Sequence, residues 1–180
     1  NGLSMDPEKV EAIKKAEEPT NTTELQRFLG LANYYRKFVP NYATVATPLH
    51  AIQSNKIAFN WTEDCKKAFE SLKMLLSQEP VMAFPDFKKK FILETDASNF
   101  AIGGVLSQEY EGQRRVVAYF SKTMMKHQMN YSVTEKECLA VVKAAKHFRQ
   151  YLYGHEFDVW TDHQCLTWLK SMRDPMGRLA

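Results

Sequence analysis

The chain has 180 residues, of which 44% are hydrophobic and 12% aromatic, enough to bury one substantial core or two small ones. Its 24 Lys and Arg residues against 21 Asp and Glu give a net charge of +3, which permits contact with nucleic acid but lacks the basic excess of a dedicated binder. Three isolated cysteines favour neither a zinc site nor a disulfide framework, and no segment resembles a membrane span or a signal peptide. We therefore expect an intracellular protein without a membrane segment.

The first half of the chain has the spacing of helices. Residues 7–18 are rich in helix formers, and Asn21 with Glu24 three residues later predicts the start of a second helix. The apolar face of that helix comprises Leu25, Phe28, Leu29, Ala32, Tyr35 and Phe38. A shorter helix is expected over 43–52, followed by one that Thr62 caps. Apolar residues recur in this last helix at helical spacing: Cys65, Ala68, Phe69, Leu72 and Leu76.

The composition changes most clearly between Pro80 and the lysine run at 88–90, where the hydrophobic period becomes strand-like. We place a domain boundary there, between a helical unit over 1–88 and an α/β domain over 89–180.

The second half of the chain predicts a mixed sheet. Strands are expected at 91–96, 102–108 and 116–121, and their sequential order implies an antiparallel meander. A long helix over 134–152 can then return the chain to a fourth strand, 157–162, parallel to the first. A further helix is expected at residues 164–170.

Three acidic residues lie near the ends of these predicted elements. Asp96 and Asp162 end strands, and Glu137 lies in the first turn of the long helix. The stripe expected to face the sheet continues from Glu137 by helical turns through Val141, Ala145, Phe148 and Leu152. An inward carboxylate is costly unless it is paired or metal-bound, and carboxylate oxygens suit Mg²⁺ or Mn²⁺. The group predicts a divalent-metal site suited to phosphodiester hydrolysis, which two ions about 3.5–4 Å apart can promote.

Each carboxylate also has an ordinary structural explanation. Asp96 can form a turn with the backbone that follows it, and Asp162 can cap the next helix. Thr134 with Glu137 fits a capping box, in which the glutamate bonds back to the start of the helix. Glu135 lies at the flank of the inward stripe and is the weaker ligand candidate. The three residues together favour the metal site more than any one of them alone.

At these residues the chain resembles the pol polyprotein of gypsy-type LTR retrotransposons, at the end of the reverse transcriptase and the start of its RNase H domain. Residues 24–38 resemble the thumb-region helix of that family. The segments that resemble RNase H landmarks are Thr95-Asp96-Ala97-Ser98, Asn130-Tyr131-Ser132, Glu137-Cys138-Leu139-Ala140-Val141-Val142 and Thr161-Asp162-His163.

The resemblance implies a helical thumb or connection unit followed by a truncated RNase H-like mixed sheet with helices. Asp96, Glu137 and Asp162 would then be catalytic, holding two magnesium or manganese ions and cleaving the RNA strand of an RNA/DNA hybrid. The resemblance also implies a set of nucleic-acid contacts at Ser98, Asn99, Asn130, Tyr131 and Gln164. The expected partners are the hybrid and the rest of the reverse transcriptase polyprotein, in the cytoplasm or within virus-like particles.

Two departures from the family bear on activity. The chain has no Tyr-x-Asp-Asp motif, so we do not expect it to synthesise DNA. The family's RNase H domain continues into a strand and helix with a further catalytic Asp, so we expect a C-terminally incomplete piece whose three carboxylates could place the ions poorly. The alternative function is a catalytically inactive or domesticated nucleic-acid-binding module. A blander alternative is a gene-model fragment that does not fold alone.

Overall fold

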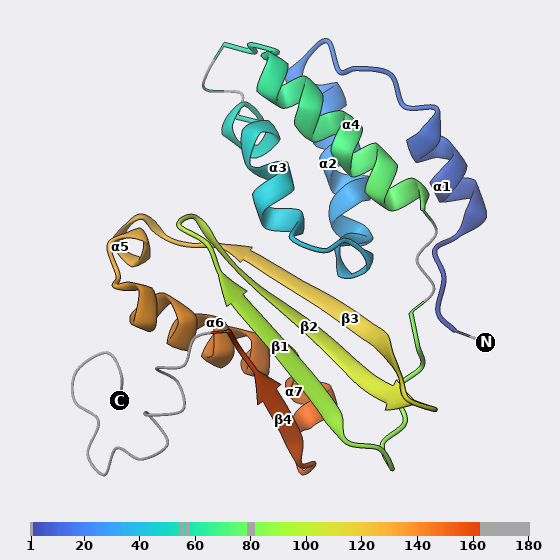
Figure 1. Ribbon diagram of the computed structural model, residues 1–180. Coiled ribbons are helices and arrows are strands. Elements are labelled where there is room, and N and C mark those ends of the chain that lie inside the picture. Colours follow the sequence, from blue (N-terminus) through green and yellow to red (C-terminus); the bar gives the residue numbers. More distant parts are fainter. Residues whose placement is uncertain (1, 55, 57, 79–81, 163–180) are drawn as a thin grey trace.

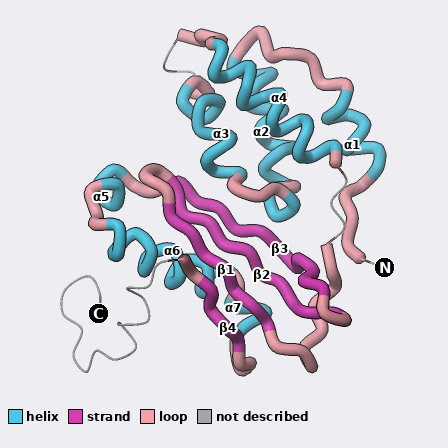
Figure 2. The backbone as a smooth tube through the Cα atoms, viewed as in Figure 1, coloured by secondary structure: helices cyan, strands magenta, loops and turns pink. Residues whose placement is uncertain are grey.

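The computed structural model describes residues 2–54, 56, 58–78 and 82–162 of the chain (Figure 1). Four helices lie at one end of a four-stranded sheet, and further helices cover one sheet face, as the tube in Figure 2 also shows. The helix predicted over 164–170 lies outside the described residues. Among the described residues, no helix is long and apolar enough to cross a membrane.

Four helices form the N-terminal unit: α1 (Pro7–Lys14), α2 (Thr22–Tyr34), α3 (Tyr42–Ala51) and α4 (Glu63–Ser77). Of these, α2 and α4 begin directly after their predicted capping residues, Asn21 and Thr62. The Asn21 side chain accepts a hydrogen bond from the Glu24 amide at 3.0 Å, and the Thr62 hydroxyl accepts one from the Cys65 amide at 3.3 Å. Every residue predicted on the apolar faces of α2 and α4 is buried, which confirms both faces.

Two helix ends in this unit differ from the prediction by several residues. Helix α1 ends at Lys14, before residue 18. Helix α2 ends at Tyr34, and the chain tightens into a 3-10 turn, η1 (Arg36–Phe38), that carries Phe38 into the core. Pro40 disfavours the helical conformation at the residue before it, so the helix cannot continue through this point.

The sheet has the predicted topology. Its strands are β1 (Phe91–Ala97), β2 (Ala101–Tyr110), β3 (Gln113–Thr123) and β4 (Phe157–Trp160), in the order β3-β2-β1-β4. Strands β1 to β3 form an antiparallel meander, and β4 pairs parallel to β1. Glu111 and Gly112 both have positive φ, 52° and 74°, which suits the tight turn between β2 and β3.

The segment between β3 and β4 is helical but divided. It comprises α5 (Lys126–Met129), α6 (Val133–His147) and α7 (Arg149–Leu152), so the single helix predicted over 134–152 is wrong in detail. Strand β4 stops at Trp160, where its pairing with Glu94 of β1 ends. Asp162 therefore follows the strand instead of ending it.

Helix α6 packs closely on the sheet because small residues meet there. A Cβ at Gly104 of β2 would lie 3.0 Å from the Ala144 Cβ, so any larger residue there would push the helix and the sheet apart by a few tenths of an ångström. The buried core of the sheet unit lies around this contact and includes Phe91, Leu93, Leu106, Ala140 and Phe148. A separate core lies among α1 to α4.

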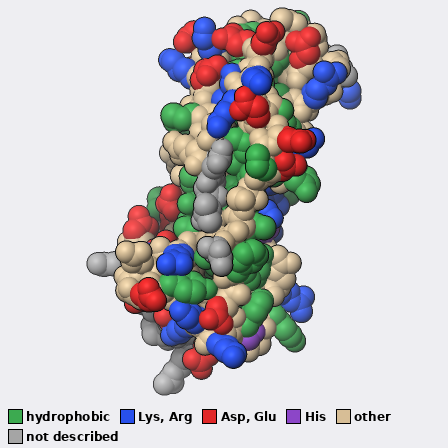
Figure 3. Space-filling model, turned by 90° about the vertical axis from the view of Figure 1, so that its right-hand side faces the viewer, with side chains coloured by type: hydrophobic (Ala, Val, Ile, Leu, Met, Phe, Trp, Pro, Cys, Tyr) green, Lys and Arg blue, Asp and Glu red, His purple; other side chains and the backbone are tan. Residues whose placement is uncertain are grey.

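The helical unit also contacts the sheet directly. The Ala43 amide donates to the Ser121 hydroxyl at 2.8 Å, and the Arg36 guanidinium donates to the Ser121 carbonyl. The domain boundary near residue 88 stays a prediction. On the face in Figure 3, acidic and basic side chains are interspersed, in agreement with the small net charge.

Candidate metal centre

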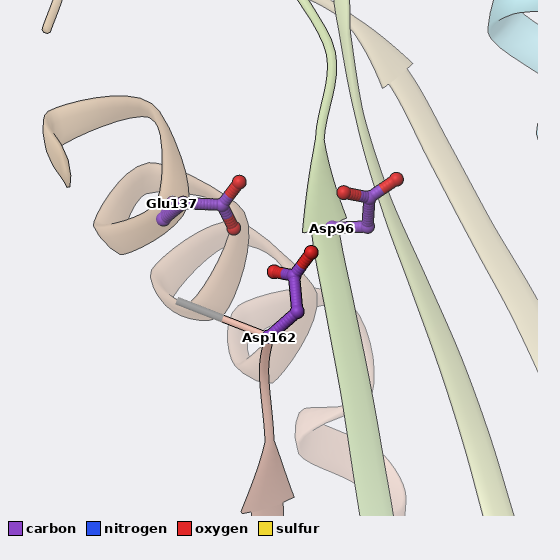
Figure 4. A group of neighbouring side chains, drawn as sticks. All are labelled: Asp96, Glu137 and Asp162. Carbon is purple, nitrogen blue, oxygen red and sulfur yellow. The ribbon is translucent and has the colours of Figure 1, made fainter. Parts of the chain in front are cut away.

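The structure brings the three predicted carboxylates together. Asp96 lies near the end of β1, Glu137 lies in α6, and Asp162 lies just after β4. Each offers a carboxylate oxygen, and the three oxygens lie within 4.8 Å of one another (Figure 4). Among the described residues, no other group of three or more His, Cys, Asp or Glu side chains meets this condition.

The burial of the three side chains is unequal. Glu137 is only 4% exposed, as predicted, whereas Asp96 and Asp162 are exposed. The site thus has one carboxylate anchored against the sheet and two that face solvent. This arrangement leaves an open side from which a substrate can approach.

The start of α6 decides which glutamate points inward. Ser132 caps this helix, with the Glu135 amide donating to its hydroxyl at 3.3 Å and its own amide donating to the Glu135 carboxylate at 2.8 Å. The capping box proposed for Thr134 and Glu137 is therefore wrong, because the helix begins two residues earlier. The Glu135 carboxylate accepts the hydrogen bond at the start of the helix, and Glu137 lies on the helix face toward the sheet.

The inward face of α6 is shifted slightly from the predicted stripe. Val141 and Ala145 are half-buried, whereas Ala140 and Ala144 are fully buried. The small alanines let the helix backbone approach Gly104, so the most buried line runs from Glu137 through these two residues to Phe148.

The turn after β1 does not depend on Asp96. The Ser98 hydroxyl accepts hydrogen bonds from the amides of Phe100 at 3.3 Å and Ala101 at 3.0 Å, and the Ser98 amide donates to the Ala101 carbonyl at 2.8 Å. Ser98 thus has the turn-forming role considered for Asp96. The capping role considered for Asp162 concerns a helix outside the described residues.

The predicted nucleic-acid contacts lie partly around this centre. Ser98, Asn99 and Asn130 are exposed and Tyr131 is half-buried, while Gln164 lies outside the described residues. The Lys136 ammonium donates to the Asn99 side chain at 3.4 Å, which links the turn after β1 to α6 beside Glu137. No sequence signal pointed to Lys136, because a lysine beside two glutamates has the pattern of a solvated helix surface.

The neighbouring Cys138 does not belong to the group of three carboxylates. Burial, then the charges of Glu137 and Glu135, raise the pKa of the Cys138 thiol. The thiol is therefore a weaker acid than an exposed cysteine, and the group that the structure brings together consists of carboxylate oxygens.

Two small adjoining pockets extend from Asp96 toward the helical unit. Their volumes are about 150 and 130 Å³, and Asp96, Gly103 and Asn41 line both of them. Asn41 immediately precedes α3, so the helical unit contributes to the surroundings of a carboxylate in the sheet. No local sequence signal connects these positions, which are distant along the chain.

An antiparallel meander followed by a helix and a parallel strand, with carboxylates gathered from β1, from α6 and from just after β4, defines an RNase H-like α/β domain. Residues 61–159 match the family of the RNase H-like domain found in reverse transcriptase, and the chain belongs to that family. The predicted resemblance and the fold class are both confirmed.

The relatives of the chain are polyproteins of LTR retrotransposons. The Pol polyprotein of transposon 297 from Drosophila melanogaster is 43% identical over 180 residues, covering 99% of this chain and 17% of the relative. That of transposon opus from the same organism is 42% identical, covering 99% and 19%. The Tf2-3 polyprotein of Schizosaccharomyces pombe is 39% identical, covering 92% and 13%. The chain thus spans less than a fifth of these relatives.

Solved structures share the fold. A foamy viral protease-reverse transcriptase in complex with double-stranded DNA has a TM-score of 0.79 at 21% identity, covering 95% of this chain and 30% of that one. A foamy viral protein of the same kind in complex with an RNA/DNA hybrid has a TM-score of 0.76 at 22% identity, covering 97% and 25%. At such identities the likeness establishes the arrangement of helices and sheet.

Proposed function

We propose that this region hydrolyses the RNA strand of RNA/DNA hybrids, as the RNase H part of a reverse transcriptase polyprotein. The observation that carries the proposal is the meeting of Asp96, Glu137 and Asp162 from three separate elements. Membership of the reverse transcriptase RNase H-like family supports the choice of substrate.

The donor set fits hard divalent cations. It consists of carboxylate oxygens, which suit Mg²⁺ or Mn²⁺, and no His or Cys side chain belongs to the group among the described residues. When bound, two such ions would neutralise charge on the phosphodiester and activate the attacking water. We infer that Asp96, Glu137 and Asp162 are the ligands.

The residues of the chain have distinct roles in this proposal. Glu137 is fixed by the packing of α6 and sets the position of the site, whereas exposed Asp96 and Asp162 face the bound strand. The predicted contacts at Ser98, Asn99, Asn130, Tyr131 and Gln164 would hold the hybrid. The helical unit would guide the duplex toward the carboxylates, and binding should weaken with salt because phosphate contacts release counterions.

The test is cleavage of an end-labelled RNA/DNA hybrid with Mg²⁺ or Mn²⁺. It is run on the 180-residue chain and on the same residues within a longer polyprotein of the kind the relatives form. We expect hybrid but not DNA duplex to be cut, and we expect Asp96→Asn and Glu137→Gln to reduce the rate by about 100-fold or more. Glu17→Gln, at an exposed site in the helical unit, is the matched control and should cut like the parent.

Two results would count against the proposal. Retained cleavage in both carboxylate variants would place the activity elsewhere. Hybrid binding without cleavage in either form of the protein would favour the inactive nucleic-acid-binding module instead.

A further inference from the structure

A row of residues crosses the sheet from Asp96 to the helical unit. Asp96 pairs with Gly103 of β2, and Gly103 pairs with Ser121 of β3, so the three positions share one sheet face. The first turn of α3 rests on this row, because the Ser121 hydroxyl accepts the buried hydrogen bond from the Ala43 amide, two residues after Asn41 of the preceding loop. The loop is therefore held in a fixed position beside Asp96.

Asn41 is the residue of this loop that lies over the row. Its backbone is left-handed, with φ of 51°, and its side chain makes no capping hydrogen bond to α3. Its side-chain oxygen would lie 3.3 Å from a Cβ built on Gly103, so the absence of a side chain there leaves room for the amide. An exposed amide thus lies next to Asp96 with its hydrogen-bonding groups available.

The pockets beside Asn41 lack the chemistry of a phosphate site. Among the described residues that line them, there is no Lys, Arg or His, while the Asp96 and Glu94 carboxylates are present. Such surroundings repel an anion but accept a neutral group that both donates and accepts hydrogen bonds. The ribose 2′-hydroxyl is such a group, and it distinguishes RNA from DNA.

We propose that Asn41 is a specificity-determining residue that hydrogen-bonds a 2′-hydroxyl of the RNA strand beside Asp96. The inference rests on the proposed function in taking the RNA strand as the one held at Asp96. The helical unit then takes part in distinguishing the hybrid from a DNA duplex, a role that the carboxylates alone cannot have.

The test measures affinity by fluorescence anisotropy with Ca²⁺, which takes the same kind of oxygen ligands. The probes are an RNA/DNA hybrid, the DNA duplex of the same sequence, and hybrids with one 2′-deoxyribonucleotide moved stepwise along the RNA strand. The variant is Asn41→Gly, because glycine accepts the left-handed backbone while the amide is lost. Asn60→Gly, at an exposed asparagine before α4, is the matched control.

We expect the parent and Asn60→Gly to lose about 5-fold in affinity at one deoxy position, the size of a single net hydrogen bond. In Asn41→Gly the deoxy substitution at that position should no longer reduce affinity. The ratio of the affinities for hybrid and for DNA duplex should fall by about the same factor. In Gly103→Ala the asparagine itself is retained, but the new Cβ crowds its amide. The loss of affinity at the same deoxy position should therefore become smaller.

An unchanged pattern of deoxy effects in Asn41→Gly would overturn the inference, as would a parent that binds hybrid and DNA duplex equally. Cleavage tests the proposed function separately. A parent that cuts hybrid while Asn41→Gly keeps every deoxy effect refutes only the role of Asn41. If the parent never cuts hybrid but loses affinity at a deoxy position that depends on Asn41, the role of Asn41 in binding stands. The proposed nuclease activity is then refuted.

Discussion

The contact between Gly104 and Ala144 sets the distance between α6 and the sheet, and a single methyl group tests it. In Gly104→Ala the new Cβ would lie 3.0 Å from the Ala144 Cβ, whereas carbon atoms pack best at about 3.5–4.0 Å. Helix α6 would have to move outward by several tenths of an ångström. Overpacking of this kind costs about 1–3 kcal/mol, so we expect the free energy of unfolding to fall by about 2 kcal/mol and Tm by about 4–8 °C.

The assay is urea and thermal unfolding followed by circular dichroism. Gly30→Ala is the matched control, because a Cβ at that position in α2 meets nothing within 4 Å, and alanine there should stabilise the helix by about 0.5–1 kcal/mol. Ala144→Gly alone should cost about 0.5–1 kcal/mol, as glycine within a helix does, and it should cost less in the Gly104→Ala background because it removes the opposing methyl group there. The same outward movement would carry Glu137 away from Asp96, so metal affinity should fall together with stability. If Gly104→Ala is as stable as the parent, or if Ala144→Gly costs as much in the Gly104→Ala background as it does alone, the close approach does not set the position of α6.

Three further predictions concern contacts that hold the site. Ser121→Ala leaves the Ala43 amide without its buried partner, and we expect urea unfolding to show that the free energy of unfolding falls by about 1–3 kcal/mol. An unchanged urea midpoint would contradict the fixed position of the loop. Glu135→Ala removes half of the capping box, so the α6 amides near Ser132 should exchange hydrogen faster and stability should fall by about 1 kcal/mol, whereas Glu137→Gln should leave the cap intact. Burial, with the charge of Arg36 adding to it, lowers the pKa of His147, so the unfolded chain takes up this proton first. Stability should therefore fall as pH drops below about 6.5. The fall should be smaller in His147→Gln, and an identical pH profile in that variant would refute the assignment.

Local signals in the sequence predicted local structure well. Asn21 and Thr62 cap their helices because their side chains accept hydrogen bonds from amides within the same turn. The burial of the predicted faces of α2 and α4 follows from the same short-range periodicity. The order of the strands was also predictable, since a meander and a helical crossover leave few arrangements.

Choices between neighbouring residues were harder to predict. The pattern Thr134-x-x-Glu137 and the pattern Ser132-x-x-Glu135 both describe a capping box, and only the position of the preceding turn selects the second. That selection moves Glu135 to the helix end and turns Glu137 toward the sheet. One alternative start of a helix thus changes which carboxylate can serve as a ligand.

The surroundings of Asp96 were beyond prediction, because they depend on contacts between distant segments. The loop at Asn41 reaches the sheet through Ser121, a residue with no pattern of its own, and Gly103 leaves the space that the Asn41 amide occupies. A serine and a glycine in a strand carry no periodic signal. The two units therefore form one continuous surface at the candidate site only as a result of tertiary packing.

The three carboxylates are positioned by three different kinds of contact. Asp96 is set by its antiparallel pairing with Gly103, Glu137 by the packing of α6 on Gly104, and Asp162 by the parallel pairing of β4 that ends at Trp160. Like charges this close repel one another, so the packing of the surrounding elements must hold them together, and a cation bound there would offset the repulsion. Changes far from the carboxylates that loosen any one of these contacts should therefore weaken metal binding. The site is a property of the packed domain, and the local sequence around each acid specifies only part of it.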